Sequence, residues 1–236
     1  MENQVRPNIT HSPTHASDRY ALNFKGLPFK TEWTEYPDIA NLAKLLGAKP
    51  TGTKFGQPWY TLPIIHDDTT GVVLSESIHI AEYLDQTYPD TPRLMPDGTF
   101  SLHTALVAAI RAILPTTLAL RNAILTAKYL NPQSREYYIR TREKMYARPF
   151  EQWTMTDEQV KVGIAQLEAA LDNVSTWYKN ESPFFGNQLG FADMILAGYL
   201  RWCLGLWGQD SEEWKKIAGC SGGRWGRLIE SLNAHE

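Results

Sequence analysis

Strand-like patterns are confined to the first 90 residues of this 236-residue chain. The segment 88–98 then concentrates proline, aspartate and glycine, which break helices and mark exposed linkers between domains. Beyond that segment, apolar residues recur only at spacings of three and four, as they do in amphipathic helices. The sequence therefore predicts an α/β domain at residues 1–90, an exposed linker at 91–99 and an all-helical domain at 100–236.

Apolar spacing predicts the order of elements within each domain. The expected elements of the first domain are a helix at 17–25, a strand at 29–36, a helix at 39–46, strands at 59–65 and 71–75, and a final helix after the last strand. Residues 66–70 have the composition of a turn that joins the last two strands in an antiparallel hairpin. In the second domain, Pro115 falls inside a predicted helix and should kink it, because proline removes an amide donor and clashes with the preceding turn.

Charge and composition disfavour several classes of partner. The net charge is −3 with no run of Lys or Arg, so neither nucleic acid nor an anionic membrane is expected to bind. No apolar stretch is long enough to span a bilayer, and the amino terminus lacks the apolar core of a signal peptide, so we expect a cytoplasmic protein. Cys203 and Cys220 are too far apart to form a Cys-x-x-Cys pair. No metal site is expected, because the histidines also lack ligand spacing.

The stretch Ser75-Glu76-Ser77 lies where the last predicted strand meets the following helix. The first turn of a helix leaves backbone N–H groups unpaired and presents the positive end of the helix dipole. Ser77 can donate to a carboxylate there and Glu76 can pair with an ammonium, so this junction suits an amino-acid head group. The alternative is that Ser75 or Ser77 caps the helix and Glu76 compensates its dipole.

Thr61-Leu62-Pro63 lies one strand upstream of that junction. A proline at the start of a strand is well placed to be cis, which would turn the backbone of Leu62 outward as an unpaired edge. An extended peptide can pair with such an edge. The alternative is a trans proline at a strand edge, which is the commoner state of X–Pro bonds.

At these residues the sequence resembles the cytosolic glutathione transferases, which have a thioredoxin-like first domain and an all-helical second domain. The resemblance rests on LPII at 62–65, on the stretch 75–96 and on FFGNQLGFADMILAGYL at 184–200, and it covers nearly the whole chain. It implies that Leu62, the residue before a cis Pro63, pairs its backbone with the cysteinyl part of glutathione. It also implies that Glu76 and Ser77 hold the γ-glutamyl end.

Residues 19–51 more closely resemble the fungal etherase-related, or FuA-type, glutathione transferases and the bacterial β-etherases. Those enzymes place a serine in Ser-Pro-x-x-Trp ahead of the first helix, and they begin with a β-strand well before it. Ser12 and Pro13 match this motif, but Ala16 replaces the tryptophan and only eleven residues precede Ser12. The resemblance implies that Ser12 activates the thiol of glutathione. The alternative is that Ser12 is a turn residue before the helix and that Ser17 is the helix cap.

A hydroxyl has a clear chemical use at that position. A thiol has a pKa of about 8.5 and must ionise to attack an electrophile, so lowering its pKa by one unit requires about 1.4 kcal/mol of stabilisation of the thiolate. A serine hydroxyl that donates to the sulfur beside a helix amino terminus can supply that energy. No cysteine occupies this region, so the chemistry of cysteine-type relatives is not expected.

Two further features of the second domain follow from the resemblance or from composition. Gly190 and Asp193 match the capping box of the family, with glycine in place of the usual serine or threonine. Several tryptophans can either belong to the core or line an apolar pocket for an aromatic co-substrate. They are Trp153, Trp202, Trp207, Trp214 and Trp225.

The sequence therefore predicts a glutathione transferase-like enzyme that binds glutathione as co-substrate together with hydrophobic aromatic ligands. We expect it to conjugate those ligands, or to cleave them reductively, with a thiolate that Ser12 activates. One alternative is a non-catalytic ligand-binding protein whose thiol-activating loop has degenerated, and another is a scaffolding module. A homodimer is expected as well, because relatives pair the first domain of one subunit with the second domain of the other.

Overall fold

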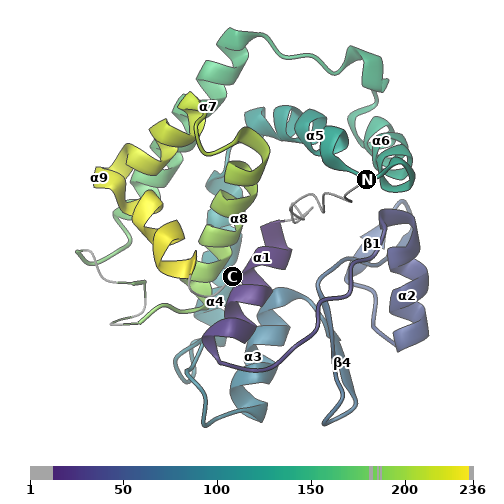
Figure 1. Cartoon of the computed structure of the whole chain (residues 1–236), viewed down its shortest axis with the longest axis vertical. Coiled ribbons are helices and arrows are strands. Elements are labelled where there is room, and N and C mark those ends of the chain that lie inside the picture. The colour runs from purple at the N-terminus through teal and green to yellow at the C-terminus, as the bar shows by residue number, and fades with distance from the viewer. Residues whose placement is uncertain (1–12, 181–182, 185, 187, 234–236) are drawn as a thin grey trace, which may run out of the picture.

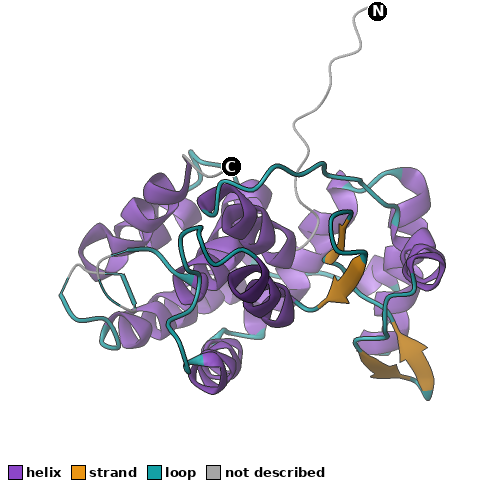
Figure 2. Ribbon diagram, turned by 90° about the horizontal axis from the view of Figure 1, so that it is seen from below, coloured by secondary structure: helices purple, strands orange, loops and turns teal. Residues whose placement is uncertain are grey.

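The structure is a computed structural model that describes residues 13–180, 183–184, 186 and 188–233. An amino-terminal part with both helices and strands is followed by a part that contains helices only among the described residues (Figure 1). This arrangement confirms the predicted α/β domain followed by an all-helical domain. Figure 2 shows the strands gathered at one end of a molecule built otherwise of helices and loops.

The first domain contains two small antiparallel sheets among its described residues. Its elements are α1 (Pro13–Phe24), η1 (Tyr36–Asp38), α2 (Ile39–Leu46), β1 (Gly52–Lys54), β2 (Gln57–Trp59), β3 (Ile64–Asp67), β4 (Val72–Ser75) and α3 (Ser77–Thr87). β1 pairs with β2, and β3 pairs with β4 in a register that sets Ile64 opposite Ser75. Because α3 begins two residues after β4 ends, the second hairpin fixes the position of the α3 amino terminus.

The expected helix at 39–46 and the antiparallel pairing of β3 with β4 are confirmed. The single strand expected at 59–65 is wrong, because residues 60–63 around Pro63 lie outside any strand, β2 ends at Trp59 and β3 covers 64–67. The strand expected at 29–36 is wrong. Phe29 and Trp33 are 38% and 44% exposed, so the alternation of apolar and polar residues creates no buried face that would hold a strand in place. The β1–β2 hairpin was not predicted from the sequence.

The second domain is a bundle of helices. Its elements are α4 (Phe100–Ile113), α5 (Thr117–Tyr129), α6 (Pro132–Tyr146), η2 (Phe150–Gln152), α7 (Asp157–Ser175), α8 (Phe191–Trp207) and α9 (Glu212–Leu232). The kink expected at Pro115 is confirmed as a complete break, with α4 and α5 meeting at 89°. α9 is interrupted at residues 220–223, where the backbone leaves the helical region.

Helix caps account for where two of these helices begin. At α7, the Thr156 hydroxyl accepts from the Gln159 N–H while the Gln159 side chain accepts from the Thr156 N–H. At α8, the Asp193 carboxylate accepts from the Gly190 N–H at 3.1 Å, which supplies one half of a capping box because glycine has no side chain. The expected role of Asp193 as a cap is confirmed.

One hydrophobic core runs through both domains. It includes Tyr20 and Ala21 of α1, Ile80 and Leu84 of α3, and a row of buried residues on α8. α1 packs along α8, so the first helix of the chain lies against a helix near its end (Figure 1). A smaller cluster around Trp153 packs between α5, α6 and η2. Because α1 packs in this core against both α8 and α3, the α1 residues that face α3 have fixed positions.

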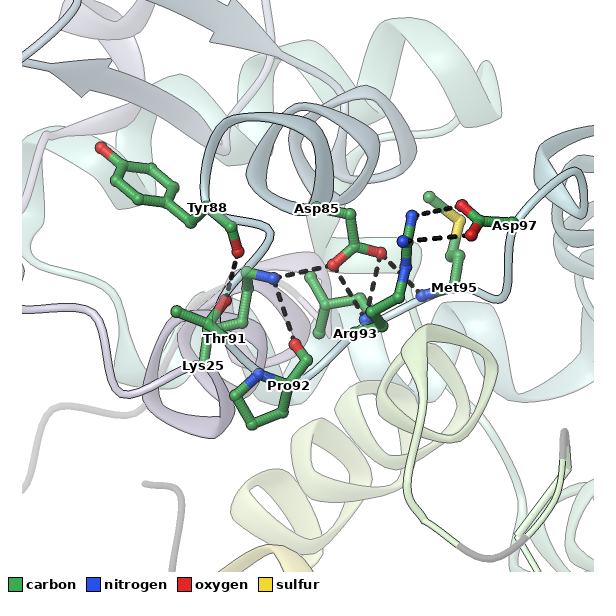
Figure 3. A network of polar contacts seen from close by, with 9 residues as sticks. Lys25, Asp85, Tyr88, Thr91, Pro92, Arg93, Met95 and Asp97 are labelled. Atoms are coloured by element: carbon green, nitrogen blue, oxygen red, sulfur yellow. Dashed lines mark hydrogen bonds and ion pairs between the residues drawn. The ribbon is translucent and has the colours of Figure 1, made fainter.

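The segment that connects the domains is anchored by Asp85 of α3 (Figure 3). The Lys25 ammonium donates to the Asp85 carboxylate at 2.8 Å, and the backbone N–H groups of Leu94 and Met95 donate to it at 3.0 and 2.9 Å. Leu94 and Met95 are buried at 1% and 5% exposure. The expectation of an exposed linker is therefore wrong at these two residues, because apolar side chains and a buried carboxylate hold the segment against the protein.

A second junction links the domains on the side of α2 and α6. Glu35 accepts hydrogen bonds from the Asn131 amide at 2.7 Å and from the Ser134 hydroxyl. The Ser134 oxygen in turn accepts from the Tyr36 N–H at 2.8 Å. The Gln133 amide donates to Asp38 at 3.2 Å. The start of α6 is thus bonded to η1 and its flanking residue, and Figure 1 shows α6 close to α2.

Within the described part of the chain, no single helix has both the length and the apolar composition needed to cross a membrane. α4 and α5 meet that criterion only as a pair, across their 89° bend.

Candidate functional site

The peptide bond between Leu62 and Pro63 is cis, as the position of this proline predicted. It lies between β2 and β3, directly before the first residue of β3. Among the described residues, the backbone N–H and C=O of Leu62 have no hydrogen-bond partner. Leu62 therefore offers the donor and acceptor that an extended peptide needs in order to pair with it.

The α3 amino terminus carries the second predicted part of the site. Glu76 occupies the cap position with a φ of +72°, and no side chain makes a capping hydrogen bond there. Ser75 has a buried hydroxyl without a hydrogen-bond partner among the described residues. The alternative reading of Ser75 or Ser77 as a simple helix cap is therefore wrong.

The Ser77 hydroxyl is instead bonded across the domain to α1. It donates to the Asp18 carboxylate at 3.0 Å, and both side chains are buried. The other carboxylate oxygen of Asp18, Oδ1, is buried and has no hydrogen-bond partner among the described residues. Sequence reasoning missed Asp18, although an acid next to the buried face of a predicted helix was a signal that could have drawn attention to it.

The electrostatic setting of Asp18 is unfavourable to a negative charge. Burial raises the pKa of its carboxyl to about 8, the hydrogen bond from Ser77 lowers it in part, and the charge of Glu76 raises it further. Near neutral pH the carboxyl therefore holds a proton in most molecules. A neutral carboxyl can donate a hydrogen bond as well as accept one.

A cleft of about 1740 Å³ lies between the two domains. Leu62 and Pro63 line it, and so does Asp18, whereas Glu76 and Ser77 are not among its lining residues. From the second domain, the lining includes residues of the α4–α5 bend, of α5, α6 and α8. The cleft therefore places Leu62, Pro63 and Asp18 on one surface. Glu76 and Ser77 lie outside the cleft, and Ser77 is bonded to the Asp18 carboxylate.

One wall of the cleft combines aromatic rings with cations from both domains. The Lys54 ammonium lies 4.3 Å from the centre of the Trp59 ring, and the Lys144 ammonium lies 4.0 Å from that of Phe55. Partial burial lowers the pKa of Lys54, and the positive charge of Arg142 nearby lowers it further. A wall of this kind attracts negatively charged and aromatic groups.

The tryptophans divide between core and cleft. Trp153, Trp214 and Trp225 are buried in the hydrophobic clusters, which confirms the core reading for them. Trp207 donates to the Asn122 side chain at 2.9 Å. Trp202 lines the cleft and therefore fits the pocket reading. Since α8 supplies Trp202, the helix that packs on α1 also shapes the binding surface.

Ser12 lies outside the described residues, which begin at Pro13. Ser17 is fully buried inside α1, four residues after the helix begins, so the alternative reading of Ser17 as the helix cap is wrong. Burial raises the pKa of the Cys203 thiol to about 12, which keeps it protonated and unreactive. No group of His, Cys, Asp and Glu side chains that could hold a metal ion occurs within the described ranges.

Comparison with known families and proteins gives consistent matches. The family model for the glutathione S-transferase N-terminal domain matches residues 18–87, and the model for the C-terminal domain matches residues 101–235. A glutathione S-transferase-like protein, ustS of Aspergillus flavus, is 30% identical over 226 residues, which cover 89% of this chain and 79% of that protein.

Solved structures of fungal proteins share the architecture closely. A glutathione S-transferase of Ceriporiopsis subvermispora, CsGST63524, crystallised in complex with glutathione, is 37% identical with a TM-score of 0.90, covering 95% of this chain and 91% of that one. The glutathione transferase GSTFuA2 of Phanerochaete chrysosporium is 35% identical with a TM-score of 0.85, at 95% and 91% coverage. The β-etherase LigF of Sphingobium is 13% identical with a TM-score of 0.62, which shows a shared fold alone. Together these matches confirm a thioredoxin-like first domain followed by an all-helical domain.

Proposed function

From the premise that this chain belongs to the glutathione S-transferase family, we propose that it binds glutathione in the cleft and transfers it to hydrophobic aromatic electrophiles. The observation that carries the proposal is the backbone of Leu62, which lines the cleft and whose N–H and C=O have no partner among the described residues. Support also comes from the relatives of Ceriporiopsis subvermispora, whose structures hold glutathione.

Each part of glutathione has a proposed partner in this arrangement. The N–H and C=O of Leu62 pair with the cysteinyl peptide unit, since they have no other partner among the described residues. At the start of α3, Glu76 is proposed to pair with the ammonium of the γ-glutamyl head group. Ser77 is proposed to hold the head group through its backbone N–H, because its hydroxyl donates to Asp18. The cations of the aromatic wall add a positive potential that favours an anionic tripeptide.

The proposed reaction is a nucleophilic displacement. The glutathione thiol loses its proton to water or buffer, and the sulfur forms a bond to an electrophilic carbon while the leaving group departs with its electron pair. In an aryl ether the leaving group is a phenolate, which then takes up a proton. Ser12 is proposed to donate a hydrogen bond to the sulfur and so to favour the thiolate. Trp202 and the other aromatic side chains of the cleft would hold the co-substrate.

Replacing Ser12 by alanine tests the catalytic part of the proposal. Loss of one charge-assisted hydrogen bond is expected to cost about 1.5 to 3 kcal/mol, or roughly one to two decades in rate at neutral pH. Glutathione affinity should stay nearly unchanged, because the head-group contacts lie elsewhere. The measurements are steady-state turnover with 1-chloro-2,4-dinitrobenzene and calorimetry with glutathione, on the parent and Ser12→Ala. Equal turnover of the two proteins, with equal affinity, would reject Ser12 as the activating group.

The second candidate function is ligand binding without catalysis. The cleft favours this function, because its volume of about 1740 Å³ is larger than glutathione alone would fill. The absence of the family tryptophan at Ala16 favours it too. This reading predicts that the parent protein binds glutathione or aromatic ligands but turns over no faster than buffer. Absence of any binding would leave the scaffolding role instead.

We also propose that the protein is a homodimer, because relatives pair the two domains across an isologous interface. Light scattering should then return about twice the chain mass of 26.8 kDa at micromolar concentration. A value near 26.8 kDa would show a monomer.

A further inference from the structure

Asp18 has an unusual combination of burial and missing partners. It lies on α1 with 4% of its surface exposed, and it lines the cleft. Oδ2 accepts from the Ser77 hydroxyl, which engages the only hydrogen that Ser77 can donate from its side chain. Oδ1 is left without a partner among the described residues, although buried polar atoms nearly always have one. An unpaired buried oxygen beside a cleft is a position where a ligand can complete the hydrogen bonding.

We propose that Asp18 determines the specificity of this site, and that its free carboxyl oxygen bonds the carboxylate of the γ-glutamyl head group. The inference rests on the proposed function, since it names the partner of a glutathione-like ligand. Ser77 then acts as a positioning residue, because its hydroxyl fixes the orientation of the Asp18 carboxyl and cannot at the same time donate to the ligand.

The chemistry requires a proton on Asp18. Two carboxylates in contact repel each other, whereas a protonated carboxyl donates to a carboxylate in a strong hydrogen bond. The surroundings favour the protonated form. Glu76, at the junction between β4 and α3, adds a negative charge, and Ser77 contributes a neutral hydroxyl. Among the described residues, no Lys, Arg or His forms an ion pair with Asp18.

The proton makes ligand binding depend on pH. Burial raises the pKa of the Asp18 carboxyl to about 8, so the donating form is lost as the pH rises through that value. If only the protonated form binds the head group, affinity should fall about tenfold from pH 7 to pH 9. Asparagine has the same shape, donates from its amide nitrogen at any pH and accepts from Ser77 with its oxygen. Asp18→Asn should therefore keep the affinity at pH 7 and lose the part of the pH dependence that comes from this carboxyl.

The test is isothermal calorimetry with S-methylglutathione between pH 6 and pH 9. This probe has no thiol, so its sulfur contributes no titration. The proteins compared are the parent, Asp18→Asn and the control Asp68→Asn. Asp68 also lines the cleft, but its side chain is 95% exposed, so Asp68→Asn removes a carboxyl from the cleft without touching the buried one. The ammonium of the probe titrates in all three measurements, so the readout is the ratio of affinities between two proteins at each pH. The ratio of the parent to the control should stay constant, and the ratio of the parent to Asp18→Asn should fall about tenfold from pH 7 to pH 9.

A second measurement compares proton uptake on binding. At pH 8.5, binding to the parent should take up about half a proton more per ligand than binding to Asp18→Asn, which calorimetry in buffers of different ionisation enthalpy reports. Equal pH profiles for the parent and Asp18→Asn, or equal proton uptake, would overturn the role of Asp18 and leave the proposed function intact. Absence of S-methylglutathione binding to both folded proteins at every pH would overturn the proposed function and this inference with it.

Discussion

Asp85 and Asp18 lie in the same domain and are equally buried, at 4% exposure each, yet their carboxylates differ in what surrounds them. Asp85 meets the Lys25 ammonium and two backbone N–H groups, those of Leu94 and Met95 (Figure 3). Asp18 has one hydrogen bond, from the Ser77 hydroxyl, and the negative charge of Glu76 nearby.

The difference separates a structural acid from a candidate functional one. A buried charge with a cation and backbone donors around it holds elements together, and here it ties α3 to the connecting segment. A buried acid with an unpaired oxygen lowers stability when it ionises, and such groups concentrate at binding and catalytic sites. Burial alone would not distinguish the two residues, whereas their hydrogen-bond partners do.

Replacing Asp85 by asparagine should give the largest effect on stability. The substitution leaves the Lys25 ammonium buried without its counter-charge, which costs about 3 to 5 kcal/mol when one partner of a buried ion pair is removed. Urea unfolding followed by circular dichroism measures the change in the free energy of unfolding. A loss below about 1 kcal/mol would show that Asp85 and Asp18 do not differ as described.

The ionisation of Asp18 should give the next largest effect, as a dependence of stability on pH. Its pKa is about 3.8 for an unperturbed aspartate and about 8 in the folded protein. The folded state therefore binds more protons than the unfolded state between these values, and stability falls as the pH rises through that window. Each unit of the pKa shift corresponds to about 1.4 kcal/mol in the free energy of unfolding. Relaxation around the charge reduces the expected loss of stability to the order of 3 kcal/mol.

The measurement is urea unfolding of the parent and Asp18→Asn at pH 5 and pH 8. Asp18→Asn should lose less stability than the parent over this interval, because asparagine does not titrate. Parallel losses in the two proteins would mean that Asp18 has an ordinary carboxyl.

The smallest effect is expected at Asp97, which serves as a matched control for Asp85. Asp97 forms an ion pair with Arg93, but its side chain is 83% exposed. Exposed pairs of this kind contribute about 0 to 1 kcal/mol, so Asp97→Asn should change the free energy of unfolding only slightly. A loss comparable to that of Asp85→Asn would show that burial of the pair is not what matters.

The sequence predicted those features that depend on neighbouring residues. The helix at 39–46, the break at Pro115 and the cis bond at Pro63 follow from apolar spacing and from the chemistry of proline. The junction at Glu76 and Ser77 was located for the same reason, because a strand and a helix meet there in sequence.

Features that depend on distant segments were not predicted. The strand expected at 29–36 needed a buried face, which the packing does not provide for Phe29 and Trp33. The burial of Leu94 in the connecting segment depends on Asp85, whose ion-pair partner Lys25 lies 60 positions away in sequence. The role proposed for Asp18 depends on its contact with Ser77, which lies 59 positions away in sequence and is brought against α1 by the fold.

The contact between η1 and α6 has a consequence for the rate at which the protein works. The domains share the core between α1 and α8, and they are joined again by the hydrogen bonds of Glu35, Asn131 and Ser134. Opening the cleft by rotation of the domains about their shared core would therefore break these hydrogen bonds. Exchange of bound molecules then depends on brief breaking of these hydrogen bonds or on side-chain motion at the mouth of the cleft, over microseconds to milliseconds. Residence time can thus be tuned at residues that touch no ligand.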